Sequence, residues 1–132
     1  MKKYKLTDET ITFCGATLYR IEALKDFSNV KKGDKGGFVQ SEENLSHDGK
    51  CWVYDNATVR GNAKVFDNAT VRRNATVRGS AVVSGNAAVR GDAVVRGNAA
   101  VRGDAVVTGN AFVTGSAVVT ENAVVRGDAI LC

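Results

Sequence analysis

The chain has no proline, one histidine and three cysteines among its 132 residues. Without proline, no ring fixes a turn or interrupts a strand, so turns must come from other residues. Cys14, Cys51 and Cys132 are odd in number and widely spaced. This arrangement excludes a disulfide framework and a paired-cysteine metal site. We therefore expect reduced thiols, with Cys51 buried, and no metal.

Long apolar runs are also missing, so no segment can cross a membrane as a helix. The basic start, Met1 to Lys5, is not followed by the apolar core of a signal peptide. From these absences we expect a cytoplasmic protein. The length is that of one domain.

A six-residue repeat is what the chain does have. It begins near Cys51 and continues to Cys132, with an aliphatic residue two positions after each repeated alanine and Asn, Asp or Ser directly before it. The alanines are Ala57, Ala63, Ala69, Ala75, Ala81, Ala87, Ala93, Ala99, Ala105, Ala111, Ala117, Ala123 and Ala129. A fixed short period of this kind indicates a repeat architecture.

One repeat unit, Asn62 to Asp67, shows how the pattern folds. Side chains alternate along a strand, so Ala63 and Val65 point inward while Lys64 and Phe66 point outward. The following Gly-Asn or Gly-Asp pair tolerates positive φ and forms a corner. Such short strands bury their apolar face only by stacking on copies of themselves. Three units close a triangle, which predicts a parallel β-solenoid of about 18 residues per turn.

The pattern of aliphatic, any, Gly, Asn or Asp, small, any residue is seen in residues 59–64. On this pattern, residues 51–132 resemble the hexapeptide-repeat, left-handed parallel β-helix family. The resemblance implies the left hand of the coil. Residues 24–27, 33–39, 44–46 and 51–54 resemble a narrower group, the uncharacterised hexapeptide-repeat proteins of phages, prophages and some bacteria. Those proteins are often labelled acetyltransferases on the strength of the fold alone.

Residues 1–50 lie outside the repeat, and we interpret them as an N-terminal β-rich cap on the β-helix of residues 51–132. Short strands are predicted over residues 4–6, 10–13 and 17–24, where β-branched residues alternate with others. Residues 31–37 read as a turn-rich connection. The cap covers the first coil, whose strands would otherwise expose backbone and apolar interior. Trp52 is predicted to pack beneath it.

Positive charge is concentrated in residues 60–102, where eight basic side chains face only Asp67 and Asp92. At 18 residues per turn, Arg60, Arg78 and Arg96 stack in one column. Such a surface attracts anions or acidic proteins; the alternative is a solvated face that deters aggregation. Nucleic acid is the weaker choice, because aromatic residues do not interleave with the arginines. The predicted anion or partner site comprises Arg60, Arg72, Arg73, Arg78, Arg90, Arg96 and Arg102.

Apolar side chains also occupy outward positions in the second half of the repeat. Isolated exposed valines are ordinary, but a contiguous patch indicates a contact surface. We expect a homo-oligomer. It is either a dimer joined end to end through the C-terminal coil, or a trimer packed through flat faces, as the resemblance implies. The predicted interface residues are Val94, Val106, Phe112, Val118, Val124, Ile130 and Leu131.

Catalytic signals are weak. The related acyltransferases use a histidine base at an interface and projecting loops that hold acyl-CoA. This chain offers only His47, beside Asp48 and before the regular coils, and no loop interrupts residues 51–132.

The sequence leaves two hypotheses for the function. The first is a non-catalytic binding protein without a cofactor, such as a phage-encoded inhibitor of a bacterial defence system acting in the host cytoplasm. Its basic face would bind a host protein, a nucleoprotein or an anionic nucleotide. The alternative is an acetyl-CoA-dependent acetyltransferase with His47 as base.

Overall fold

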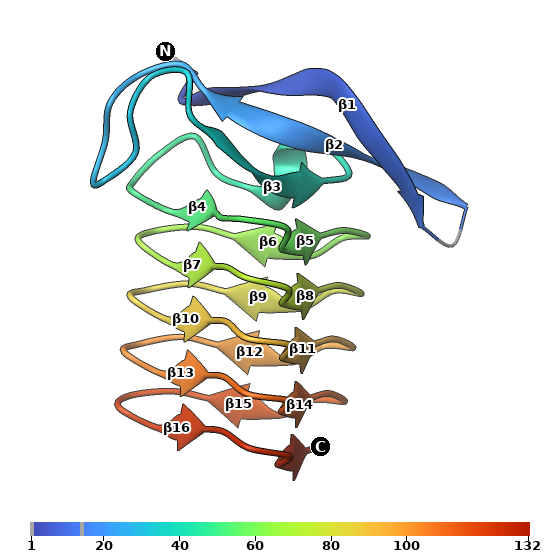
Figure 1. Cartoon of the computed structure of the whole chain (residues 1–132). Helices are drawn as coiled ribbons and strands as arrows, with labels where there is room; N and C mark the ends of the chain where they lie inside the picture. The colour runs from blue at the N-terminus through green and yellow to red at the C-terminus, as the bar shows by residue number, and fades with distance from the viewer. Residues whose placement is uncertain (1, 14) are drawn as a thin grey trace.

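The computed structural model describes residues 2–13 and 15–132, and these residues form an all-β structure without an α-helix. The N-terminal part contains three longer strands and one turn of 3₁₀ helix (Figure 1). These elements are β1 (Tyr4–Phe13), β2 (Ala16–Ala23), β3 (Lys35–Val39) and η1 (Glu42–Asn44).

Fourteen strands of two residues each follow, one for each repeat unit. They are β4 (Trp52–Val53), β5 (Thr58–Val59), β6 (Lys64–Val65), β7 (Thr70–Val71), β8 (Thr76–Val77), β9 (Val82–Val83), β10 (Ala88–Val89), β11 (Val94–Val95), β12 (Ala100–Val101), β13 (Val106–Val107), β14 (Phe112–Val113), β15 (Val118–Val119), β16 (Val124–Val125) and β17 (Ile130–Leu131).

These strands form the three parallel sheets of a triangular solenoid, as the repeat predicts. The first sheet runs β3-β5-β8-β11-β14-β17, the second β4-β7-β10-β13-β16 and the third β6-β9-β12-β15. Among β4 to β17, strand partners lie 18 residues apart, as in the pair of Thr58 with Thr76. Each coil therefore contains three repeat units, and the predicted coil length is confirmed.

The interior consists of the alternating alanines and valines. From Ala57 to Val113 every inward alanine and valine is at most 1% exposed, whereas Lys64 and Phe66 are exposed. Every sixth residue from Asp55 to Gly127 has positive φ. Most of these corner residues are glycines, which adopt this conformation without a Cβ penalty. The predicted corner is confirmed.

The N-terminal segment pairs antiparallel within itself and then joins the solenoid. β1 pairs with β2 and β2 with β3, both antiparallel, while β3 pairs parallel with β5. The prediction of a connection over residues 31–37 is wrong at its end, because Lys35 to Gly37 belong to β3. A Cβ on Gly37 would lie 2.4 Å from the Ala57 carbonyl oxygen, so only glycine permits this approach to the first regular coil.

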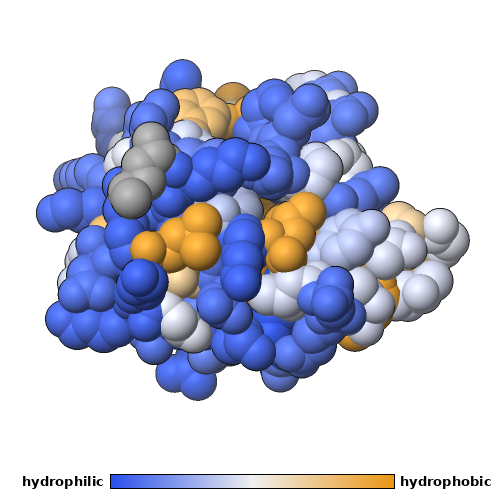
Figure 2. All heavy atoms as spheres, turned by 90° about the horizontal axis from the view of Figure 1, so that it is seen from above, coloured by the Kyte–Doolittle hydropathy of each residue, from blue (hydrophilic) through white to orange (hydrophobic). Residues whose placement is uncertain are grey.

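Aromatic side chains fill the space between the cap and the first coil. Trp52 is 1% exposed, and its ring meets Tyr4 and Phe27 edge to face. Cys51 is buried beside them, so the predictions for Trp52 and Cys51 are confirmed. Figure 2 shows that the cap end of the molecule is largely hydrophilic, with small apolar areas only.

The last coil is less covered. Outward Val118, Val124 and Ile130 are 54%, 58% and 66% exposed, and Leu131 is 36% exposed. In the described part of the chain, no helix is long and apolar enough to span a membrane.

Candidate functional site

The arginines of the repeat lie at the three edges of the solenoid. Arg60, Arg78 and Arg96 follow successive strands of the first sheet and form one column. The register of β5, β8 and β11 fixes this column, in agreement with the stacking expected from the repeat. Arg72 and Arg90 follow strands of the second sheet, Arg102 follows a strand of the third, and Arg73 occupies a corner. The seven predicted residues are thus divided among several edges.

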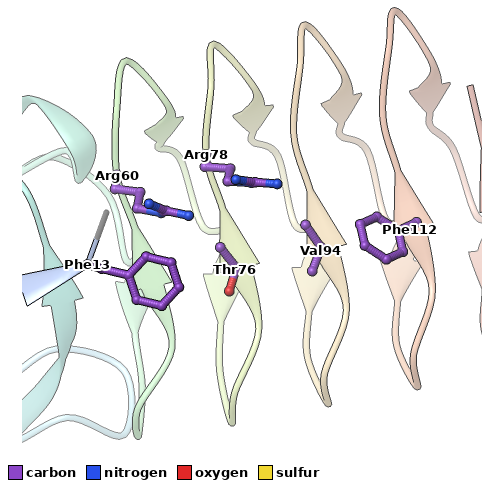
Figure 3. A pocket seen from close by; sticks show the side chains of 6 residues that line it. All are labelled: Phe13, Arg60, Thr76, Arg78, Val94 and Phe112. Atoms are coloured by element: carbon purple, nitrogen blue, oxygen red, sulfur yellow. The ribbon is translucent and has the colours of Figure 1, made fainter. Parts of the chain in front are cut away.

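Two neighbouring hollows beside the first sheet share Arg60 and Arg78 in their walls, and we refer to the two together as the groove. One part has a volume of about 200 Å³ and is lined by Phe13, Arg60, Thr76, Arg78, Val94 and Phe112. Figure 3 shows Phe13, Thr76, Val94 and Phe112 in a row along the solenoid, with the two arginine side chains next to the row. We call this part the apolar half of the groove.

A second part, of about 220 Å³, lies on the other side of the same arginines. It is lined by Ala16, Gln40, Arg60, Gly61, Arg78 and Gly79, and we call it the polar half. Because Arg60 and Arg78 line both halves, their guanidinium groups stand between an apolar and a polar compartment.

Aromatic rings do accompany the arginines, which corrects the expectation from the sequence. The guanidinium carbon of Arg60 lies 4.3 Å from the ring centre of Phe13, and that of Arg96 lies 5.2 Å from Phe112. Arg72 is placed over Tyr54 at 5.8 Å. Phe13 comes from the cap, where the period gives no signal, whereas Tyr54 and Phe112 lie in coils next to those of Arg72 and Arg96. Contacts of this kind hold each guanidinium in place without neutralising it.

Within the described residues, no arginine of the solenoid forms an ion pair with an acidic side chain. All ion pairs among residues 2–13 and 15–132 join cap residues: Lys2 with Glu42, Lys5 with Glu22, Arg20 with Glu9, and His47 with Glu42. The Nε atoms of Arg72 and Arg96 are buried without a hydrogen-bond partner in this part of the chain. Within the described residues, Arg60, Arg78 and Arg96 thus have no carboxylate partner in an ion pair.

His47, the candidate base, is integrated into the cap. Its Nδ1 accepts a hydrogen bond from the backbone N–H of Lys3 at 3.1 Å, and its Nε2 lies 2.8 Å from Glu42 Oε1. The ring also stacks on Tyr4, with centres 4.2 Å apart. Since both ring nitrogens are engaged, His47 positions the start of β1 against η1.

A buried amine and thiol lie nearby. Lys3 Nζ donates to the Cys51 carbonyl oxygen at 2.7 Å and lies 3.3 Å from Cys51 Sγ. Burial lowers the pKa of Lys3 and raises that of Cys51, which favours the neutral forms of both. Of the other cysteines, Cys132 is a free exposed thiol, and Cys14 lies outside the described residues.

The predicted interface residues occupy different surfaces. Val94 and Phe112 line the groove, Val106 and Val124 lie on the second sheet, and Val118 lies on the third. Ile130 and Leu131 belong to the final coil.

The groove also contains residues that sequence reasoning missed. Phe13, Gln40 and Gly79 contribute to its walls. Phe13 and Gln40 precede the repeat, so its period carries no signal for their position. Gly79 reads simply as one corner residue among many.

Comparison with known proteins shows sequence similarity between part of this chain and a bacterial protein. The chain is 33% identical to the "Uncharacterized acetyltransferase YdcK" of Escherichia coli (strain K12), over an alignment of 67 residues that covers 45% of this chain. The match spans 21% of the length of that relative. No protein-family model matches the chain. The chain is thus a β-solenoid distantly similar to a protein named as an acetyltransferase.

Proposed function

We propose that this protein is a non-catalytic binding module that holds an anionic partner at the arginine column of the first sheet. The partner class comprises host proteins with acidic surfaces, nucleoproteins and charged nucleotides. The resemblance to phage-borne proteins supports a role as an inhibitor of a bacterial defence system in the host cytoplasm.

The observation that carries the proposal is the uncompensated charge of Arg60, Arg78 and Arg96. Ion pairs within the described residues are confined to the cap. Guanidinium groups form paired, charge-assisted hydrogen bonds with carboxylates and phosphates. Backbone hydrogen bonds between stacked coils fix the spacing of the three arginine backbones, so binding has to order only the side chains.

The proposed module is oligomeric. Exposed Val118, Val124 and Ile130 support an apolar contact between copies, through the C-terminal coil or through flat faces. Either arrangement places several arginine columns in one particle and raises avidity for an extended partner. Light scattering gives the number of subunits.

Titration with defined polyanions tests the proposal. Poly-glutamate and a short single-stranded oligonucleotide serve as probes for the wild type and for Arg60→Gln/Arg78→Gln. The matched control, Lys64→Gln/Arg126→Gln, removes the same charge from exposed positions outside the groove. We expect at least one probe to bind in a salt-dependent manner, with affinity about tenfold or more lower in the groove variant only. Absence of binding, or equal loss in both variants, would contradict the proposal.

A second candidate function is acetyl transfer, favoured by the similarity to the Escherichia coli protein named as an acetyltransferase. Acetyl-CoA would then be the cofactor and His47 the base. That role would require His47 to release Lys3 or Glu42, its present hydrogen-bond partners. Incubation with acetyl-CoA and small amines tests this candidate: turnover that His47→Ala abolishes would establish the enzyme, and absence of turnover is the result that the binding module predicts.

A further inference from the structure

We infer that the groove binds a nucleotide with two or more phosphates. The phosphates lie in the polar half against Arg60, Arg78 and the Gly79 amide, and the base lies in the apolar half between Phe13 and Phe112. This inference rests on the proposed function and names the ligand class of the same site.

The corner amides indicate where an anionic oxygen fits. At three corners an outward N–H donates to a side-chain oxygen: Gly61 to Gln40 Oε1 at 2.7 Å, Arg73 to Asp55 Oδ2 at 3.1 Å, and Gly85 to Asp67 Oδ2 at 3.1 Å. Gly79 occupies the equivalent corner one coil after Gly61 and lines the polar half. Its N–H, like that of Gly97 one coil further on, has no acceptor in the part of the chain that the structure describes. Gly79 differs from Gly97 in lying beside Arg60 and Arg78. An external oxygen can therefore take the place that Gln40 fills above it.

The two arginines supply charge on either side of that oxygen. Arg60 and Arg78 follow strands that are paired in register, so their backbones are separated by one coil, roughly 4.8 Å. Figure 3 shows the two side chains extending in the same direction. Adjacent guanidinium groups with this spacing suit the oxygens of neighbouring phosphates, to which each guanidinium donates two hydrogen bonds. A diphosphate therefore uses the polar half more fully than a single anion.

The lining of the apolar half suits an aromatic group of the ligand rather than a phosphate. Its floor is Thr76 and Val94, and its ends are the rings of Phe13 and Phe112 (Figure 3). Phe13 is 49% exposed, which leaves ring surface for a ligand. Aromatic side chains stack on nucleobases irrespective of base identity. Pyrophosphate alone would leave this half empty, and an uncharged apolar molecule would leave the guanidinium groups unpaired.

The volumes of the two halves are consistent with a ligand that occupies both. The apolar half measures about 200 Å³ and the polar half about 220 Å³, whereas small-molecule sites begin at about 300 Å³. A ligand that extends past Arg60 and Arg78 from one half into the other would occupy a volume within the usual range of small-molecule sites. A nucleotide has this form, with its charge at one end and a flat ring at the other.

Calorimetric titration with ATP, inorganic pyrophosphate and adenosine tests the inference. We expect ATP to bind more tightly than pyrophosphate, and adenosine to bind least. Arg60→Gln/Arg78→Gln should weaken ATP and pyrophosphate about ten- to a hundredfold, while Lys64→Gln/Arg126→Gln changes either by less than about threefold. Phe112→Leu should weaken ATP and leave pyrophosphate unchanged, because only ATP reaches the apolar half. Unaltered circular dichroism of each variant confirms its fold.

Three results would overturn the inference. Equal affinity for ATP and pyrophosphate would show that the base is not recognised. Equal ATP binding by the wild type and Arg60→Gln/Arg78→Gln would place the nucleotide elsewhere. Failure of both ATP and pyrophosphate to bind, with poly-glutamate binding still dependent on Arg60 and Arg78, would overturn the nucleotide and leave the binding module standing. If poly-glutamate and the oligonucleotide fail as well, the proposed function falls too.

Discussion

At the scale of the residue, the conformation of the corner residues affects the free energy of folding of each coil. Corner residues have positive φ throughout, and most are glycine, but Arg73 adopts φ 60° in the same column as Gly91. A residue with a Cβ in this conformation destabilises the fold by about 1–2 kcal/mol. A glycine destabilises it by about 0.5–1 kcal/mol, because glycine loses more conformational freedom on folding. Arg73 is therefore a strained position, and Gly91 is a relaxed one.

Exchanging the residue types at these two corners gives opposite effects. Arg73→Gly should stabilise the protein by about 0.5 kcal/mol, the difference between the two costs. Gly91→Ala should destabilise it by about 1 kcal/mol or more, because the new Cβ would lie 3.0 Å from the Gly109 backbone nitrogen. Thermal unfolding followed by circular dichroism measures both shifts. Equal shifts of the same sign would show that corner conformation does not control stability.

At the scale of the element, a polar cluster joins η1 to the start of β1. Glu42 pairs with Lys2 and His47, and the Tyr4 hydroxyl donates to the backbone carbonyl oxygens of Glu42 and Leu45. Hydrogen bonds from Lys2 and then His47 hold the pKa of Glu42 below its usual value. The contacts of the Glu42 carboxylate with Lys2 and His47 stabilise the folded cap only while Glu42 is ionised.

The sign of the pH effect follows from this lowered pKa. Glu42 contributes stability above its unfolded pKa, about 4.3, and the contribution is lost as the pH falls through the folded value. Glu42→Gln should therefore have a lower melting temperature than the wild type at pH 7, with the difference vanishing in acid. The neighbouring exposed Glu43 offers the control Glu43→Gln, for which we expect no such difference. A gap between wild type and Glu42→Gln that stays constant with pH would refute this role.

The elements differ in how far the sequence determines them. Each strand from β5 to β17 lies where the six-residue period predicts it, because one repeat unit encodes one strand and one corner. The cap is different, since β1 to β3 have no period and their change from antiparallel to parallel pairing depends on distant contacts. One such contact is the approach of Gly37 to the Ala57 carbonyl, which only the folded chain brings about.

At the scale of the whole molecule, the solenoid stacks residues that lie 18 apart in the repeat into columns along its axis. Arg60, Arg78 and Arg96 could be placed in one column from the sequence, because their spacing equals one coil. The groove could not be predicted, since Phe13 and Gln40 come from the cap, where the six-residue period gives no position. In the function that we propose, binding therefore depends on the place where the non-repetitive cap meets the column of arginines.

The most direct test of this account is nuclear magnetic resonance of the arginine Nε–H groups during titration with inorganic pyrophosphate. Each guanidinium then reports its own contact with the anion. The account predicts saturable shifts at Arg60 and Arg78, with little change at the exposed Arg126 outside the groove. Uniform small shifts at all arginines, or no shift at Arg60 and Arg78, would contradict it.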